Sequence, residues 1–326
     1  MLARTFGRGG VPVSEVGFGA WGIGKTMWLG ADDAESLRAL DRALDLGVTF
    51  IDTAPGYGRG HSEALVGQVI RERGAEDRVF VATKVPPKNL QWPARRGIPV
   101  SQCFPGAHVI SSAEHSLYTL GLERIDLLQF HVWQDEYLDQ QGGWMEALAS
   151  LKNQGKVRFT GISVNDHDPG SALRAVQSGL FDSVQVIYNL FDQSPEKELF
   201  PLCVKHGVAV IARVPFDEGG LTGKVTPETK FPDGDFRNHY FQGHRKREVF
   251  ERAQALDALR GREAASLAEL ALRFCLSQEA VTTVIPGMRT VRHVESNVAV
   301  SDGRPLSPEL RETLRAHAWP RNFYSS

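Results

Sequence analysis

Short apolar runs alternate with longer amphipathic segments along most of this sequence. Eight of the runs are rich in β-branched residues and have the length of buried strands: residues 16–20, 48–52, 79–84, 126–131, 157–163, 183–189, 208–213 and 283–286. The longer segments have helical spacing, and residues 63–73 place their apolar side chains on one face. Strict alternation of strands and helices predicts a parallel sheet, and eight such units predict a closed (β/α)8 TIM barrel.

Three segments are additional to the eight strand–helix units of a minimal barrel. Residues 5–15 have the pattern of a short β-hairpin ahead of the first barrel strand. Residues 86–108 are a proline-rich insertion, and residues 216–244 are a long loop that contains glycines. Both loops follow the carboxyl end of a predicted strand, so we expect them to overhang the barrel mouth, where the active sites of TIM barrels lie. All these segments are predicted to form one domain, residues 1–326.

Two segments near the N-terminus match nucleotide-binding sequence motifs literally. Residues 17–22 match GxGxxG, and residues 19–26 match the P-loop pattern. Both motifs require a helix directly after the loop, because the amide groups at its N-terminus bind phosphate. Here the first credible helix begins at about Asp33, well beyond either pattern. We therefore expect the glycines to let the first strand end in a tight loop, with Trp21 facing a substrate pocket.

Ionisable residues stand at the carboxyl ends of three consecutive predicted strands. Asp52 ends the first strand, Lys84 the second and His131 the third, and Tyr57 follows Asp52 on a turn flanked by glycines. A charged side chain inside an apolar strand is costly, whereas one at the strand tip can face a site. Each residue alone has a plain structural explanation, but their joint position predicts a catalytic centre.

These four residue types suit the reduction of a carbonyl group. Such a reaction needs an acid that protonates the forming alkoxide, and Tyr57 is the candidate. A free tyrosine has a pKa of about 10, so a cation must stabilise its phenolate, and Lys84 can do so in a desolvated pocket. Asp52 would keep that lysine protonated, and His131 would donate a hydrogen bond to the carbonyl oxygen.

Composition narrows the classes of function. The formal net charge of −2 offers no basic surface for nucleic acid. No apolar run approaches the roughly 20 residues that span a bilayer, and the N-terminus lacks the apolar core of a signal peptide. Three dispersed cysteines favour a reducing compartment over a disulfide framework or a zinc site. We therefore expect a cytoplasmic enzyme that acts on small molecules and holds no metal ion.

The four strand-end residues together resemble the catalytic tetrad of the aldo-keto reductases. Residues 52–63, with the sequence DTAPGYGRGHSE, are similar to the first signature segment of that family. The resemblance covers nearly the whole chain. It implies a (β/α)8 barrel that binds NADP(H) in an extended form without a Rossmann fold and reduces aldehydes or ketones to alcohols.

The resemblance also implies the residues that bind the cofactor. Ser163, Asn165 and Gln185 are similar to residues that hold the nicotinamide carboxamide. Residues 214–224 resemble the loop that folds over the diphosphate, and residues 285–297 resemble the segment that grips the adenosine phosphate. The implied cofactor contacts are Ser163, Asn165, Gln185, Arg213, Pro215, Leu221, Gly223, Lys224, Gly287, Arg289, His293 and Asn297.

Three positions depart from the usual pattern of the family. Arg213 stands where many members have an aromatic or small residue beside the nicotinamide. Its guanidinium can stack on a flat ring but repels an oxidised, cationic one. Val164 separates Ser163 from Asn165, and Ser296 stands where an acidic side chain often contacts the adenine.

The substrate pocket is expected to have aromatic walls. Trp21, Trp92 and Trp133 are its predicted wall residues, together with Tyr57 and His131. The short tail that ends the chain is similar to that of bacterial family members, in which other loops define the pocket. We therefore expect residues 86–108 and 216–244 to shape it.

Two other functions fit the same residues. An NAD(P)-dependent dehydrogenase of sugars or alcohols would run the reaction in the opposite direction. A cofactor-sensing regulatory subunit, like the potassium-channel β subunits that share this fold, would need a partner-binding surface, and the sequence contains no obvious one. The sequence leaves open the physiological substrate, the favoured direction, the strength of any preference for NADPH over NADH and the oligomeric state.

Overall fold

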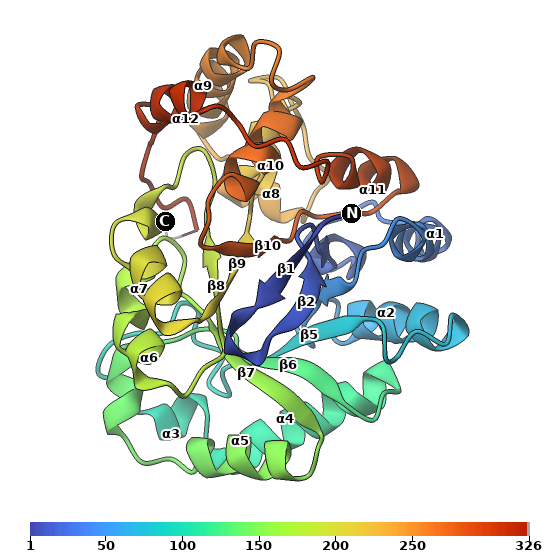
Figure 1. Cartoon of the computed structure of the whole chain (residues 1–326), viewed down its shortest axis with the longest axis vertical. Helices are drawn as coiled ribbons and strands as arrows, with labels where there is room; N and C mark the ends of the chain where they lie inside the picture. Colours follow the sequence, from blue (N-terminus) through green and yellow to red (C-terminus); the bar gives the residue numbers. More distant parts are fainter. Residues whose placement is uncertain (325–326) are drawn as a thin grey trace.

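A barrel of parallel strands forms the centre of the molecule (Figure 1). This computed structural model describes residues 1–324, so the last two residues of the predicted domain lie outside the described residues. The barrel strands are β3 (Phe18–Gly19), β4 (Phe50–Asp52), β5 (Phe80–Val85), β6 (Ile125–Phe130), β7 (Val157–Ser163), β8 (Ser183–Ile187), β9 (Ala209–Arg213) and β10 (Val281–Val284). Neighbouring strands pair in chain order, as the alternating pattern predicts.

The two edges of this sheet meet and close the barrel. Val16 bridges Val284 and Gly19 bridges Gly287, both in parallel orientation, and the amide of Gly19 donates to the carbonyl of Pro286 at 3.0 Å. A Cβ atom on Gly19 would lie 2.6 Å from the carbonyl oxygen of Ile285, so only glycine permits this approach. The glycines near the N-terminus therefore serve barrel closure.

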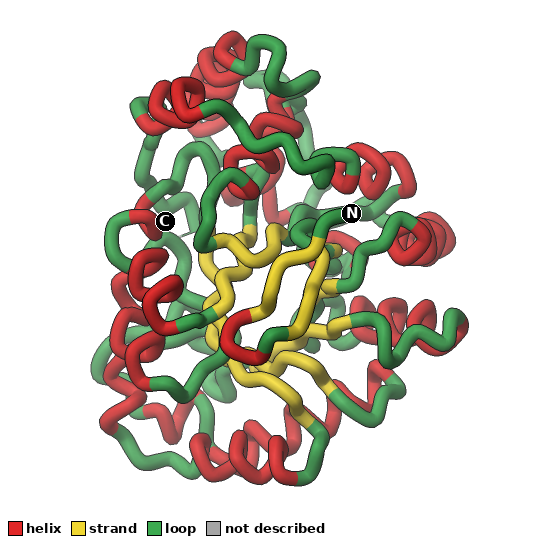
Figure 2. The backbone as a smooth tube through the Cα atoms, viewed as in Figure 1, coloured by secondary structure: helices red, strands yellow, loops and turns green. Residues whose placement is uncertain are grey.

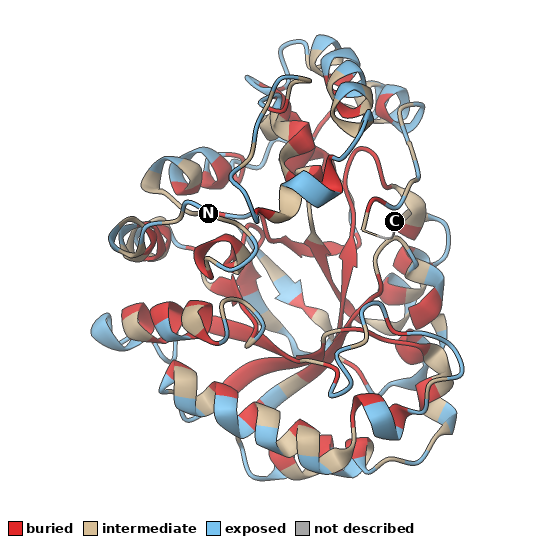
Figure 3. Ribbon diagram, turned by 180° about the vertical axis from the view of Figure 1, so that it is seen from behind, coloured by how far each residue is buried: buried red, intermediate tan, exposed pale blue. Residues whose placement is uncertain are grey.

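The helices form the outer layer of the barrel (Figure 2). They are α1 (Asp33–Asp45), α2 (His61–Glu72), α3 (Val100–Cys103), α4 (Gly106–Leu120), α5 (Trp144–Asn153), α6 (Leu173–Ser178), α7 (Leu199–His206), α8 (Phe236–Tyr240), α9 (Arg245–Leu259), α10 (Leu267–Leu276), α11 (Val291–Val298) and α12 (Pro308–Arg315). The helices that pack on the strands are buried on their inner faces and exposed on their outer faces (Figure 3), whereas α9 and α12 lie beyond α10, away from the strands (Figure 1). Among the described residues, no helix is long and apolar enough to cross a membrane.

The first helix begins where the sequence predicts it, at Asp33. The side chain of Asp32 accepts a hydrogen bond from the amide of Glu35 and so caps the helix. Only a short 3₁₀ turn, Trp21–Ile23, lies between β3 and this helix start. Because no α-helix follows the glycines directly, the chain has no phosphate-binding helix at either nucleotide-binding pattern.

An antiparallel hairpin closes the amino-terminal end of the barrel. Its strands are β1 (Ala3–Phe6) and β2 (Val11–Ser14), slightly earlier than the predicted residues 5–15, and they lie across the barrel end in Figure 1. The ring of Phe6 is fully buried and lies 4.7 Å from the ring of Phe80, measured between centroids. This apolar plug leaves the opposite, carboxyl end of the barrel for a site.

The two long insertions contain more regular structure than the sequence predicts. The first insertion includes α3, and α4 already begins at Gly106, inside the segment 86–108. A Cβ atom on Gly106 would lie 2.4 Å from the carbonyl oxygen of Gly143, so close packing against the start of α5 fixes this helix end. The second insertion contains a 3₁₀ segment, Asp217–Thr222, and α8.

Candidate active site

The side chains of three strand-end residues meet at the carboxyl end of the barrel. The Lys84 Nζ donates to Asp52 Oδ1 at 2.6 Å, to the carbonyl oxygen of Thr53 at 2.9 Å and to the Tyr57 hydroxyl at 3.2 Å. Lys84 is fully buried, so these contacts replace the water that an ammonium group needs. The pairing of β4 with β5 sets the distance between Asp52 and Lys84.

Two glutamines complete the surroundings of the carboxylate. The side-chain amide of Gln185 on β8 donates to Asp52 Oδ2 at 2.7 Å, and that of Gln129 on β6 lies 3.4 Å from the same oxygen. Asp52 therefore receives hydrogen bonds from three different strands. This network fixes the carboxylate and, through it, the position of the Lys84 ammonium group.

Burial and charge act in opposite directions on the tyrosine. Burial raises the pKa of Tyr57 above its ordinary value, and the nearby charge of Lys84 only partly offsets this effect. The sequence argument expected the lysine to bring the pKa down towards neutrality, and the structure corrects that expectation. At neutral pH the phenol is therefore protonated and can act as a proton donor.

Opposing effects also act on the lysine. Burial lowers the pKa of Lys84, but the charge of Asp52 and the contact with Tyr57 more than compensate, so the pKa is raised. The ammonium group therefore stays charged beside the phenol. The charge of Asp52 is the largest effect that opposes burial here, and an isolated buried lysine would lose its proton.

His131 lies next to the tyrosine. The two ring centroids are 5.8 Å apart, and the ring of Trp92 stands edge-on to the imidazole at 4.6 Å. Burial, followed by the charges of Lys84 and Arg213, lowers the pKa of His131 well below its ordinary value. The imidazole is therefore neutral, and one of its nitrogens can donate a hydrogen bond.

The rest of the signature segment holds the turn that carries Tyr57. The hydroxyls of Thr53 and Ser62 are 2.9 Å apart, and Ser62 also donates to the carbonyl of Ala20. Glu63 is buried and accepts a hydrogen bond from the Thr83 hydroxyl at 2.6 Å. These contacts tie the turn to β5 and to the loop after β3, so the tyrosine has a fixed position.

A cavity of about 1340 Å³ opens above these residues. Most residues that the sequence predicts for the site line it: Trp21, Asp52, Tyr57, Trp92, His131, Ser163, Asn165, Gln185, Arg213, Pro215, Lys224, Gly287, Arg289, His293 and Asn297. Both long insertions contribute to its walls, for example through Leu90 and Phe231. The expectation that these insertions overhang the mouth is confirmed.

Positive side chains gather at one part of the cavity wall. Arg289, Arg292 and Lys224 line it, and the imidazole of His293 lies beside them. Burial, followed by the charge of Arg289, lowers the pKa of His293. Helix α11 begins after Thr290, whose side chain accepts a hydrogen bond from the His293 amide. Such a group of cations suits a phosphate ligand.

A scan against models of protein families identifies the fold. Residues 15–318 match the model of the aldo/keto reductase family. The chain belongs to this family.

Individual relatives agree with this assignment. Aldo-keto reductase YhdN of Bacillus subtilis (strain 168) is 34% identical over 290 residues, which cover 88% of this chain and 85% of that protein. The NADH-specific methylglyoxal reductase of Escherichia coli (strain K12) is 30% identical over 304 residues, 89% of this chain and 90% of that protein. A crystal structure of an aldo-keto reductase from Klebsiella pneumoniae in complex with NADPH has a TM-score of 0.72 and 25% identity, and the match covers 99% of this chain and 97% of that one.

Several predicted site residues of this aldo-keto reductase lie elsewhere. Trp133 does not line the cavity and is fully buried between Phe130 and Phe181. We predicted Trp133 as a wall residue of the substrate pocket, but it follows the end of β6 at Phe130, and its ring packs against Trp144 of α5 and Phe181. Leu221 and Gly223 also lie outside the cavity wall.

One predicted cofactor contact has a different set of partners. Asn165 accepts from the amide of Ala94 and donates to its carbonyl, both at 3.0 Å. Its amide group therefore anchors the first insertion above the barrel. Val164 separates Ser163 from Asn165, so Asn165 stands one residue later than in many family members, and here its side chain binds Ala94.

Several residues of the cavity wall were not predicted from the sequence, and Asp166, Glu218 and Tyr324 are among them. Tyr324 belongs to the C-terminal tail. The resemblance to bacterial members implied that other loops define the pocket, whereas the tail contributes to it as well. No local pattern marks Tyr324, because its contacts involve residues about a hundred positions earlier. Asp166 could have been suspected, since it directly follows the motif at Ser163 and carries a charge at a strand end.

Proposed function

We propose that this aldo-keto reductase reduces aldehydes or ketones to alcohols with NADPH, and that Tyr57 supplies the proton. The observation that carries the proposal is the triple contact of the buried Lys84 ammonium group with Asp52, Thr53 and Tyr57. A lysine in this setting stabilises negative charge on the phenol oxygen in the transition state. It thus makes a protonated, buried tyrosine a usable acid.

Each polar side chain has a separate task in this proposal. The phenol of Tyr57 donates a hydrogen bond to the carbonyl oxygen and releases its proton as the alkoxide forms. The neutral ring of His131 donates a second hydrogen bond and orients the same oxygen. Asp52 acts on the lysine alone, and the aromatic rings of Trp21 and Trp92 exclude water from the reacting carbonyl.

The cavity fits a dinucleotide cofactor, which supplies the hydride when it is bound. Its volume of about 1340 Å³ exceeds the roughly 300–1,000 Å³ of ordinary small-molecule pockets. The cations Arg289, Arg292 and Lys224 provide partners for the phosphates of NADPH. Among residues 1–324, the buried side-chain atoms without a hydrogen-bond partner include His131 Nδ1 and Arg213 Nε. Unpaired buried polar atoms are typical of a site that binds a ligand.

Small carbonyl compounds are the proposed substrates, and the cytoplasm is the proposed location. Three separate free cysteines, Cys103, Cys203 and Cys275, support a reducing compartment. The NADH specificity in the name of the E. coli relative makes NADH the main rival cofactor. Discrimination between the two cofactors would come from the cations that face the 2′-phosphate.

Turnover with purified protein tests the proposal. NADPH consumption is measured with a panel of aldehydes, ketones and aldose sugars, and NADP⁺ reduction is measured with alcohols and polyols. Many turnovers with a carbonyl compound support the reductase, and faster turnover with alcohols at neutral pH would favour the dehydrogenase. NADPH binding without turnover of any compound would refute the proposal and favour a cofactor sensor. Tyr57→Phe is the matched control for background reduction.

A further inference from the structure

The loop after β9 has an unusual backbone. We call residues 214–223 the rim loop, because Val214, Glu218 and Gly219 within it line the cavity. Val214, Asp217 and Glu218 have φ angles of 56°, 49° and 53°. Residues with side chains rarely occupy this left-handed region, and they stay there only when the surrounding structure holds them. Three such residues in one short loop therefore require external support.

The end of the chain gives that support. We call residues 319–324 the tail. Its Arg321 Nη2 lies 2.5 Å from Asp217 Oδ2, and both side chains are almost fully buried. Its Tyr324 hydroxyl donates to Glu218 Oε1. The tail thus contacts both of the adjacent left-handed residues directly, each through a different side chain.

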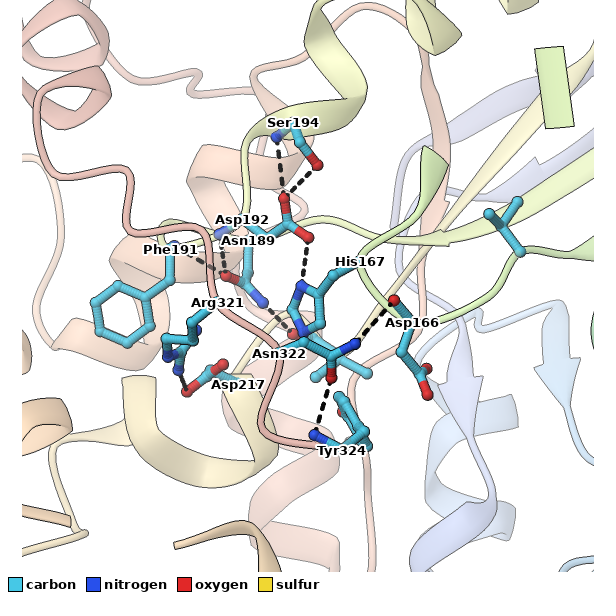
Figure 4. A network of polar contacts seen from close by, with 12 residues as sticks. Asp166, His167, Asn189, Phe191, Asp192, Ser194, Asp217, Arg321, Asn322 and Tyr324 are labelled. Atoms are coloured by element: carbon cyan, nitrogen blue, oxygen red, sulfur yellow. Dashed lines mark hydrogen bonds and ion pairs between the residues drawn. The ribbon is translucent and has the colours of Figure 1, made fainter. Parts of the chain in front are cut away.

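The tail is itself fixed at several points (Figure 4). The amide of Trp319 donates to the carbonyl of Phe191 at 2.8 Å, and the Arg321 guanidinium stacks 4.2 Å from the Trp319 ring. The Asn322 side chain donates to the carbonyl of Asp166 at 3.3 Å. The tail therefore spans from the loop after β7 to the rim loop, across the mouth of the barrel.

The rim loop contains two adjacent buried acids, Asp217 and Glu218. Burial raises the pKa of Glu218 to about 8, so its carboxyl group is mostly protonated at neutral pH. It lies next to the Asp217 carboxylate, which depends on Arg321 and on the Tyr240 hydroxyl for its partners. Loss of the tail would leave these two buried acids with fewer partners, so the left-handed loop would be less well held.

We propose that the tail is a strap on the rim loop, and that Arg321 and Tyr324 are positioning residues that retain the dinucleotide in the cavity. The rim loop follows β9, whose neighbour β10 leads to the cationic wall at Arg289. A loop held in this place covers the ligand beside that wall. The inference uses the proposed function for the identity of the ligand, whereas the strap itself is a property of the protein without cofactor.

Tyr324→Phe tests the strap, because it removes the hydroxyl that bonds Glu218 and keeps the ring. Tyr118→Phe is the matched control, since Tyr118 on α4 is 85% exposed and far from the tail in sequence. Hydrogen exchange is measured on both variants without cofactor. We expect the amides of residues 214–223 to exchange at least about threefold faster in Tyr324→Phe only, as loss of one hydrogen bond implies.

Cofactor dissociation is the second measurement. We expect NADPH to leave Tyr324→Phe about three- to tenfold faster than wild type, and to leave Tyr118→Phe at the wild-type rate. Unchanged exchange of residues 214–223, or unchanged NADPH dissociation, overturns the strap. If the melting temperature of Tyr324→Phe falls and its exchange rises over the whole protein, the same two measurements are made on Arg321→Lys. The expected results are the same.

The two proposals fail separately. Wild-type protein that does not bind NADPH would refute the proposed function, and exchange of the rim loop would still decide the strap. Wild-type protein that binds and turns over NADPH, with no effect of Tyr324→Phe on exchange, would refute the strap alone.

Discussion

Tyr57 donates the proton in our proposal, so its hydroxyl is the most sensitive single group in the molecule. We predict that Tyr57→Phe lowers the rate of carbonyl reduction at least about a hundredfold, the lower range for loss of a general acid. NADPH affinity, measured by fluorescence titration, should stay within about twofold. Near-normal turnover of this variant would contradict the assignment of the acid.

Lys84 and Asp52 act at different distances from the reaction. The lysine contacts the Tyr57 hydroxyl directly, whereas the aspartate acts through the lysine. We predict that Lys84→Met lowers kcat more than Asp52→Asn does, by about tenfold or more. Comparison of kcat for the two variants, after circular dichroism has confirmed folding, checks this order. A larger loss in Asp52→Asn would contradict the division of roles.

Arg289 is the residue on which cofactor choice depends in our proposal. Its guanidinium contacts the carbonyl of Leu29 and lies 5.5 Å from the Trp28 ring, which orients it along the cavity wall. A charge-assisted contact is worth roughly 1.5–3 kcal/mol, so Arg289→Ala should raise the Kd for NADPH about ten- to a hundredfold. The Kd for NADH should change little. Equal weakening of both cofactors would show a structural role.

The sequence alone singled out Asp52, Tyr57, Lys84 and His131, and the structure brings these candidate catalytic residues together at one end of the barrel. The signal is that Asp52, Lys84 and His131 each end an apolar run, on three consecutive predicted strands. Trp133 has no such signal, because burial of a tryptophan three residues past the end of β6 depends on how the chain turns. Tyr324 was beyond prediction, since its contact with Glu218 joins residues 106 positions apart.

At the scale of elements, the pattern of apolar residues located the strands. It did not give the bounds of those strands whose ends depend on tertiary contacts. Strand β7 has the predicted bounds, Val157–Ser163, because its apolar run stops at a polar motif. Strand β3 is only Phe18–Gly19, shorter than the predicted residues 16–20, although Val16 still bridges β10. The 3₁₀ segment of the rim loop has no sequence signal, because its left-handed residues depend on the tail.

The rim loop also makes stability depend on pH. The pKa of Glu218 is about 8 in the folded protein and about 4.5 when unfolded, so between these values only the folded state keeps the proton. Stability therefore falls as pH rises through this window, by at most about 1.4 kcal/mol per pH unit, and levels off above it. We predict a smaller decline for Glu218→Gln in urea unfolding at pH 5 to 8.5. Parallel curves for variant and wild type would contradict the raised pKa.

In the whole molecule, the residues that stabilise the fold and the candidate catalytic residues lie at opposite ends of the barrel axis. At one end Phe6 of the hairpin packs on Phe50, Phe80 and Phe159 of the barrel strands, and the tetrad occupies the other end. We predict that Phe6→Ala lowers the free energy of unfolding by about 3–5 kcal/mol, as for other buried phenylalanines. At a temperature where the variant is folded, kcat and KM should stay within about twofold. A large change in either constant would show that the plug reaches the site.

The tail at the barrel mouth has a practical consequence for handling the protein. A purification tag or an immobilising linker on the C-terminal side would follow Tyr324, which lines the cavity. A tag on the N-terminus would begin at the hairpin, on the opposite end. Preparations that differ only in the tagged end should therefore melt alike and differ in how quickly they exchange one nucleotide for another.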